Sequence, residues 1–179
     1  MKLNIRLLIG VILLAVFLAP LSRSAAETRA TVGAPNVFSY QVPAGWKLRY
    51  DQGEKYPSAT DVKDEVIMGN ISVDMETQAG ALNEWFKNSL AKQKAQYSSQ
   101  YAHFNPHIGN PTPFVTTTGT KGFRVVIRLT VGEEDIVYVF YYFAGNSNVK
   151  ILVTCFSAPE DADHYAPLFD AAMKTFVAH

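Results

Sequence analysis

The segment Ile136–Phe143, IVYVFYYF, is apolar or aromatic at every position. A strand with one wet face alternates apolar and polar residues, whereas an uninterrupted apolar run of this length is typical of a strand covered on both faces. Such a strand needs a sheet around it and a layer of structure on each side of that sheet. This requirement constrains the fold more than any other feature of the chain.

Neighbouring segments supply partners for this strand. Residues 123–131 alternate apolar and polar side chains, and the polar residues 132–135 turn the chain into the apolar run. After a second polar turn at 145–148, Val149–Cys155 alternate again. Three such runs joined by short turns predict an antiparallel meander. A shorter strand is expected at Pro113–Thr118.

The first half of the chain predicts further strands. Two short alternating runs, 38–42 and 46–50, flank the turn Pro43-Ala44-Gly45, and a longer apolar run spans Val66–Glu76. Gly69 inside that run indicates a bulge or a close packing contact. The polar residues 51–64 are expected to form a loop. The residues expected to face inward in the first two runs are Phe38, Tyr40, Val42, Trp46, Leu48 and Tyr50.

Two segments have apolar residues at helical spacing. One apolar stripe runs from Leu82 to Tyr97, and another runs from Tyr165 to Phe176. Ser157, Asp161 and Asp163 precede or begin the second helix as possible caps. The predicted fold class is therefore α+β, with an antiparallel β-sheet sandwiched between helices.

The N-terminus has the three parts of a secretory signal peptide. Basic residues Lys2 and Arg6 precede an uncharged apolar run of 15 residues, Leu7–Leu21, and Ser24-Ala25-Ala26 supplies small residues for cleavage. A membrane-spanning helix needs roughly 20 apolar residues. Residues 1–26 are thus predicted to be a cleaved signal, and an uncleaved membrane anchor is the alternative. The predicted location is periplasmic or secreted.

Cleavage after Ala26 would leave a chain of one-domain size. The expected organisation is a flexible leader at 27–36 and a single domain at 37–179. The signal contains three of the 16 basic residues and none of the 16 acidic ones, so the mature chain has a net charge of −3. A mildly acidic chain without a basic cluster does not have the electrostatics of a nucleic-acid-binding protein or of a protein held on anionic lipid.

The single cysteine, Cys155, is the first candidate for catalysis. A reactive thiol lies beside a cation or at a helix N-terminus, where its pKa is lowered. Cys155 instead continues the apolar phase of Val149, Ile151 and Val153. It is therefore interpreted as an inert core thiol, and one cysteine can form no internal disulfide.

Histidines and acids offer further candidates. His103 and His107 are four residues apart, but Pro106 between them argues against the helix that this ligand spacing needs. His164 lies among acids at the expected start of the last helix, and Glu133–Asp135 forms an acidic turn. Solvated surface groups explain all of these. The sequence contains no catalytic motif and no motif for binding phosphate or a dinucleotide. The chain is therefore predicted not to be an enzyme and to bind no cofactor.

Aromatic residues are the remaining candidates for a binding site. A tyrosine in a core needs a polar outlet for its hydroxyl, so some of those in 136–143 should reach the edge of the core or a groove. Tyr138 and Tyr142, together with Trp46, are the candidates for lining a ligand groove.

The chain resembles the bacterial PsbP-like group, which also includes the import factor Mog and DcrB-type periplasmic proteins, and it looks like an exported member. The resemblance covers most of the chain after the signal. It implies an antiparallel sheet between helices and the role of an assembly factor, small binding protein or chaperone. The segments that carry it are Phe38–Trp46, Ser72-Val73, LNEWFKNSL, Gly122 with Phe123–Val131, Ile136–Phe143, VKILVTCFS and Met173-Lys174-Thr175-Phe176.

These observations favour an exported, non-enzymatic module for binding, assembly or a chaperone-like role. Its partner would be a protein or a small apolar ligand that meets a groove between sheet and helix. Two alternatives are a secreted hydrolase that uses Cys155 or a histidine site, and a metal-binding protein that uses His103 and His107.

Overall fold

The computed structural model describes residues 29–51, 55–100, 106–131 and 134–179, with the backbone alone at 97–100, 131 and 134. The predicted signal peptide, His103 and Glu133 lie outside the described residues. Within these ranges, no helix combines the length and the apolar character needed to cross a bilayer.

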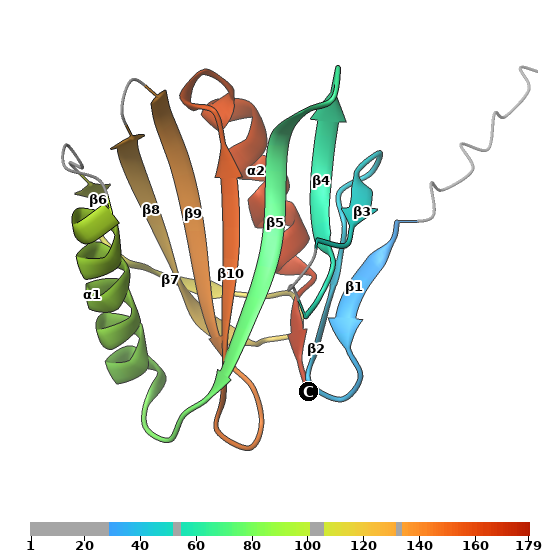
Figure 1. Cartoon of the computed structure of the whole chain (residues 1–179). Helices are drawn as coiled ribbons and strands as arrows, with labels where there is room; N and C mark the ends of the chain where they lie inside the picture. The colour runs from blue at the N-terminus through green and yellow to red at the C-terminus, as the bar shows by residue number, and fades with distance from the viewer. Residues whose placement is uncertain (1–28, 52–54, 101–105, 132–133) are drawn as a thin grey trace, which may run out of the picture.

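The main sheet has eight antiparallel strands (Figure 1). Its order is β3-β4-β5-β10-β9-β8-β6, and β7 also pairs with β8. The meander β8-β9-β10 is confirmed, and β9 lies inside the sheet with most of its side chains buried. The strands are β3 (Lys47–Arg49), β4 (Ser58–Lys63), β5 (Val66–Thr77), β6 (His107–Ile108), β7 (Thr112–Val115), β8 (Lys121–Val131), β9 (Glu134–Ala144) and β10 (Val149–Ser157).

A helix covers each face of this sheet, which confirms the predicted fold class. Helix α1 (Leu82–Gln100) packs over β8 and β9, and α2 (Ala162–Lys174) packs on the opposite face after a 3₁₀ turn, η1 (Pro159–Asp161) (Figure 1). Asp161 occupies the N-cap position of α2, but its side chain makes no capping hydrogen bond.

A small second sheet lies on the α2 side. It consists of β1 (Thr31–Ala34), β2 (Phe38–Gln41) and β11 (Val177–Ala178). The predicted flexible leader is therefore wrong over Thr31–Ala34, because β1 pairs with β2 and buries Val32 and Ala34 in the core. Two hydrogen bonds also tie the C-terminus to this sheet, from His179 N to Val37 O and between Ser39 and the His179 ring.

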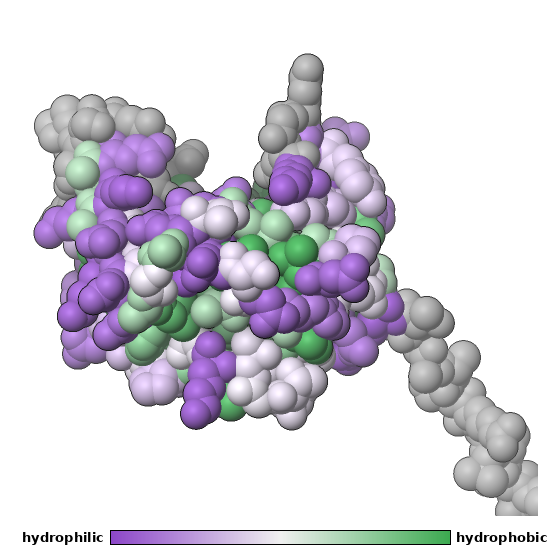
Figure 2. Space-filling view, turned by 90° about the horizontal axis from the view of Figure 1, so that it is seen from below, coloured by the Kyte–Doolittle hydropathy of each residue, from purple (hydrophilic) through white to green (hydrophobic). Residues whose placement is uncertain are grey.

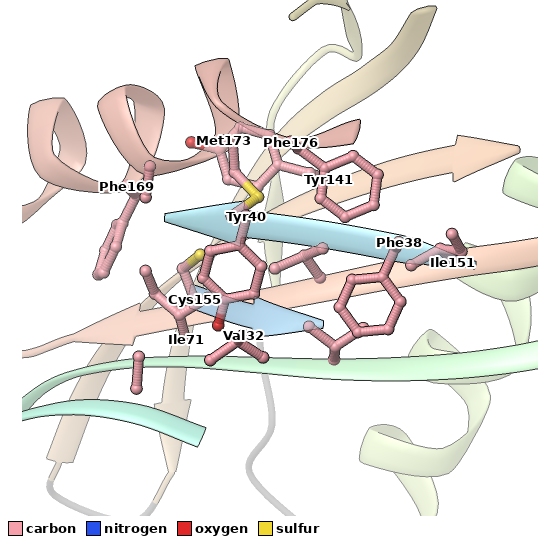
Figure 3. Close-up of a cluster of buried hydrophobic side chains, with 14 of the residues drawn as sticks. Val32, Phe38, Tyr40, Ile71, Tyr141, Ile151, Cys155, Phe169, Met173 and Phe176 are labelled. Carbon is pink, nitrogen blue, oxygen red and sulfur yellow. The ribbon is translucent and has the colours of Figure 1, made fainter. Parts of the chain in front are cut away.

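The larger core lies between the main sheet, α2 and the small sheet. Figure 3 shows side chains from β2, β10 and α2 meeting there, with Tyr40 beside Cys155. The rings of Phe143 and Phe176 stack with centroids 4.2 Å apart. Cys155 is fully buried, as predicted for an inert core thiol.

Two further predictions for the first half are wrong. The predicted loop 51–64 contains β4, in which Ser58 and Thr60 are buried beside β3 and β5. Tyr50, expected to face inward, is 77% exposed because β3 ends at Arg49 and leaves Tyr50 beyond the sheet edge.

Gly69 combines both features that its sequence position indicated. The register between β4 and β5 shifts beside it, since Asp61 pairs with Gly69 whereas Val62 pairs with Ile67. The ring of Tyr165 also lies against Gly69, so a β-carbon there would come within 2.7 Å of the ring. The glycine therefore admits α2 to close contact with the sheet.

Candidate functional site

The α1 face of the main sheet is only partly covered. Trp85 and Phe86 of α1 contact Tyr142 on β9, with ring centroids 5.4 and 4.8 Å apart. On the same side, no helix of the described chain lies over β10 and β5 (Figure 1). We call this surface the open face. Its residues include Ser72, Asp74, Tyr138, Thr154 and Phe156.

Two aromatic residues lie side by side on the open face. Tyr138 on β9 pairs with Phe156 on β10, and their ring centroids are 6.0 Å apart. Tyr138 also stacks on the buried Phe140 at 5.7 Å. Both Tyr138 and Phe156 remain half-buried, so they expose apolar ring surface next to the hydroxyl of Thr154.

A pocket of about 470 Å³ continues this aromatic pair toward η1. The start of β9 supplies Ile136, the end of β10 supplies Phe156, and the following turn supplies Pro159. The carboxylates of Asp135 and Glu160 also line it and are exposed. The pocket is thus an apolar recess with acidic side chains, built where the start of β9 meets the end of β10 and the turn that follows it.

The lower end of the molecule has a mixed surface of hydrophobic and hydrophilic residues. Figure 2 shows that end, where hydrophobic residues reach the surface as separate patches between hydrophilic ones. We take the recess beside η1 and the open face as the candidate binding surface, because an aromatic pair there adjoins a pocket.

The three predicted groove residues do not come together. Trp46 lies on the α2 side, where its ring contacts Tyr165 and Phe169 at 5.9 and 6.1 Å. Tyr142 is fully buried under α1, and its hydroxyl donates to Gln93 Oε1 at 3.2 Å. Only Tyr138 lies on the surface that continues into the pocket.

Cys155 has the environment of a structural thiol. Burial, with a further contribution from the Asp170 carboxylate, raises its pKa well above the ordinary value of 9.0. The protonated thiol is neither a nucleophile nor a metal ligand. This geometry gives no support to a hydrolase that uses Cys155.

The described histidines, His107, His164 and His179, belong to no group of side chains that could hold a metal ion. His107 lies on the short edge strand β6 and is exposed, whereas its predicted co-ligand His103 lies outside the described residues. In the part of the chain that the structure describes, no three histidine, cysteine or acidic side chains are grouped closely enough to hold a metal ion. His164 packs its ring against Tyr165 at 4.9 Å.

One charged network stabilises the α2 side. Arg124 Nε donates to Asp170 Oδ1 at 2.8 Å, and the Tyr141 hydroxyl donates to the same oxygen. Burial raises the pKa of Tyr141 above its ordinary value. Since the network links β8 and β9 to α2 through two hydrogen bonds to one carboxylate, we assign it to packing.

The chain has the PsbP/Mog1-like fold, an antiparallel sheet between two helices. No known family model matches the chain, and no curated protein matches its sequence. The similarity is to solved structures alone.

One of these is cyanobacterial PsbP (CyanoP) from Synechocystis sp. PCC 6803, with 15% identity and a TM-score of 0.62 over 89% of this chain and 99% of that one. LpqN of Mycobacterium tuberculosis, involved in cell envelope biogenesis, has 9% identity and a TM-score of 0.62 over 83% and 89% of the two chains. The Ran-binding protein Mog1p of Saccharomyces cerevisiae has 11% identity and a TM-score of 0.53 over 86% and 96%. At identities this low, the TM-scores establish a shared fold alone, and function has to be argued from the site.

Proposed function

We propose that the chain is an exported, non-enzymatic binding or assembly module that holds a protein partner on its open face and in the adjoining pocket. The observation that carries the proposal is the aromatic pair Tyr138–Phe156, half-exposed on the sheet and continuous with a recess of about 470 Å³. Two proteins of the same fold point in this direction, since Mog1p is a Ran-binding protein and LpqN is involved in cell envelope biogenesis.

The composition of the open face favours a protein partner. Protein interfaces combine a core enriched in aromatic residues with a polar rim. Here the rings of Tyr138 and Phe156 share one face of the sheet with the side chains of Ser72, Asp74 and Thr154. A partner could therefore bury the rings and meet hydroxyl and carboxylate groups elsewhere on the same face.

Export is the second part of the proposal. The basic start, apolar run and small residues of 1–26 carry it. The first described strand begins at Thr31, and Val42 N donates to Ala30 O. Cleavage after Ala26 would therefore remove no residue that takes part in the described fold. Intact mass of the protein purified from its native cells tests this, with a chain that begins at Glu27 as the expected result and an uncut chain as the contrary one.

Binding is tested by comparing co-purified proteins across surface variants. Phe156→Lys and Ile136→Lys each place a charge in the proposed interface. Val66→Lys is the matched control, because Val66 is also an apolar strand residue and is 58% exposed at the tip of the β4–β5 hairpin. All three should retain the wild-type circular dichroism spectrum.

The expected outcome is a discrete protein that co-purifies with wild type and Val66→Lys and falls at least tenfold with both interface variants, measured by quantitative mass spectrometry after mild cross-linking. The same set of proteins in equal amounts with all four forms would overturn the proposed interface.

A further inference from the structure

A second pocket lies on a different part of the molecule, between α1 and the segment that carries β6. Its volume is about 390 Å³, which falls within the range of roughly 300–1,000 Å³ usual for small-molecule sites. Helix α1 supplies Phe86 and Leu90, and the segment after the helix supplies Ile108 and Pro111. The walls are therefore aliphatic or aromatic on both sides.

Three residues of α1 form the edge of this groove because helical spacing puts them on one face of the helix. Lys87, Ala91 and Lys94 are separated by four and three residues, so they share one face of α1 beside the apolar pair Phe86 and Leu90. The two lysines lie about 10 Å apart along the helix axis, from a rise of about 1.5 Å per residue. Ala91 between them is small and leaves the groove accessible.

The groove has a single sign of charge. Lys87 and Lys94 are the ionisable residues among those described as lining it, and both are exposed. Neither takes part in an ion pair within the described ranges. An apolar recess whose described charged groups are both ammonium ions is complementary to an apolar ligand that ends in an anion.

We propose that this groove binds a medium-chain fatty acid such as dodecanoate, with the methylenes between Phe86, Leu90 and Ile108 and the carboxylate at Lys87 or Lys94. A peptide fits less well, because its backbone groups would need hydrogen-bond partners and the described lining offers no acceptor side chain. A two-chain lipid would need a larger recess. This inference is independent of the proposed protein interface, which lies on other residues.

Dodecanoate and its uncharged analogue dodecanol are the probes, titrated into the protein by calorimetry below the concentration at which dodecanoate forms micelles. Wild type should bind dodecanoate more tightly than dodecanol. It should also bind dodecanoate more tightly than decanoate, by at most about fourfold per added methylene. Absence of saturable binding to wild type would overturn the proposal.

Charge-reversal variants on α1 separate a specific site from general attraction of anions. Lys87→Glu and Lys94→Glu should weaken dodecanoate at least tenfold in combination and leave dodecanol within twofold. Lys92→Glu is the matched control, because Lys92 is an exposed lysine of the same helix that does not line the pocket. It should change neither affinity by more than twofold.

Ala91→Trp should fill the groove and abolish binding of both probes while the melting temperature stays near that of wild type. Equal weakening by Lys92→Glu, or unchanged binding in Ala91→Trp, would show that the ligand lies elsewhere and would refute the proposal.

Discussion

Replacing Gly69 by alanine tests how the sheet and α2 are fitted together. A β-carbon at Gly69 would lie 2.7 and 2.8 Å from two ring carbons of Tyr165 and 3.0 Å from the Trp46 ring. Tyr165 cannot move freely, because its hydroxyl donates to Asp61 Oδ2 at 2.8 Å and its ring packs on Phe169 at 6.0 Å. The added methyl group must therefore displace the ring or the strand.

The expected loss follows from these contacts. Overpacking of a well-packed core costs about 1–3 kcal/mol. If the displaced Tyr165 loses its hydrogen bond to the Asp61 carboxylate, about 1.5–3 kcal/mol more is lost. Replacing a glycine inside a strand by alanine raises the free energy of unfolding by about 0.5–1 kcal/mol, which offsets part of this loss. We expect the free energy of unfolding to fall by about 3 kcal/mol, which in a domain of this size lowers the melting temperature by about 6–12 °C.

Urea unfolding and thermal melts followed by circular dichroism measure the change. Gly145→Ala is the matched control, because the nearest atoms to a β-carbon there are 3.5 Å away, an ordinary contact distance. It should change the free energy of unfolding by less than about 1 kcal/mol. If Gly69→Ala is as stable as Gly145→Ala, the close packing of Tyr165 on β5 is wrong.

The further predictions concern side chains of the larger core. Trp46→Ala should lower the free energy of unfolding by about 2 kcal/mol, because it removes two ring contacts worth about 0.5–1.5 kcal/mol each in addition to buried area. An unchanged melting temperature would make Trp46 a surface residue. Tyr40→Phe should leave stability unchanged or raise it by about 1 kcal/mol, because the buried Tyr40 hydroxyl has no hydrogen-bond partner in the structure as described. Tyr141→Phe should lower stability, since it breaks the bond to Asp170. Burial raises the pKa of Tyr40 and Tyr141 above the ordinary 10.0, so the unfolded chain loses these protons first and stability should fall as the pH rises above about 10. Melts from pH 8 to 11 should show a shallower fall in Tyr40→Phe, and an equal fall would assign the loss to other groups. A thiol reagent should label Cys155 at neutral pH only after unfolding, and immediate labelling of the folded protein would contradict its burial.

The meander and the two helices could be predicted because their buried residues recur in the sequence at the spacing of a strand or of a helix. Residues 136–143 are apolar at every position, and the structure places this run inside the sheet with helices on both faces. Gly69 was informative for a similar reason, since a glycine in an apolar strand has few explanations other than a bulge or a close contact.

Strands β1 and β4 were missed because their burial depends on distant partners. β1 consists of small residues that become core only through pairing with β2. β4 has the sequence SATDVK, whose polar residues indicate a loop, yet Thr60 is buried between β3 and β5 and donates to Lys47 O. Neither partnership has a local signal in the sequence.

The candidate sites depend on how helices are placed over the sheet. Tyr138 and Tyr142 lie on the same face of β9, four residues apart, and the sequence treats them alike. Helix α1 covers Tyr142 and leaves Tyr138 half-exposed beside Phe156. The adjoining pocket joins the start of β9 to η1, which are more than 20 residues apart in the chain. Tertiary placement of this kind cannot be read from strand periodicity.

The most direct test of the central proposal is photocross-linking in living cells with p-benzoylphenylalanine in place of Phe156. The probe replaces one aromatic ring by another on the open face, and the same probe at the exposed Val66 is the control. We predict a discrete protein adduct from position 156 that is absent from position 66. No adduct at position 156, or the same adducts at both positions, would contradict the assignment of the open face as the binding surface.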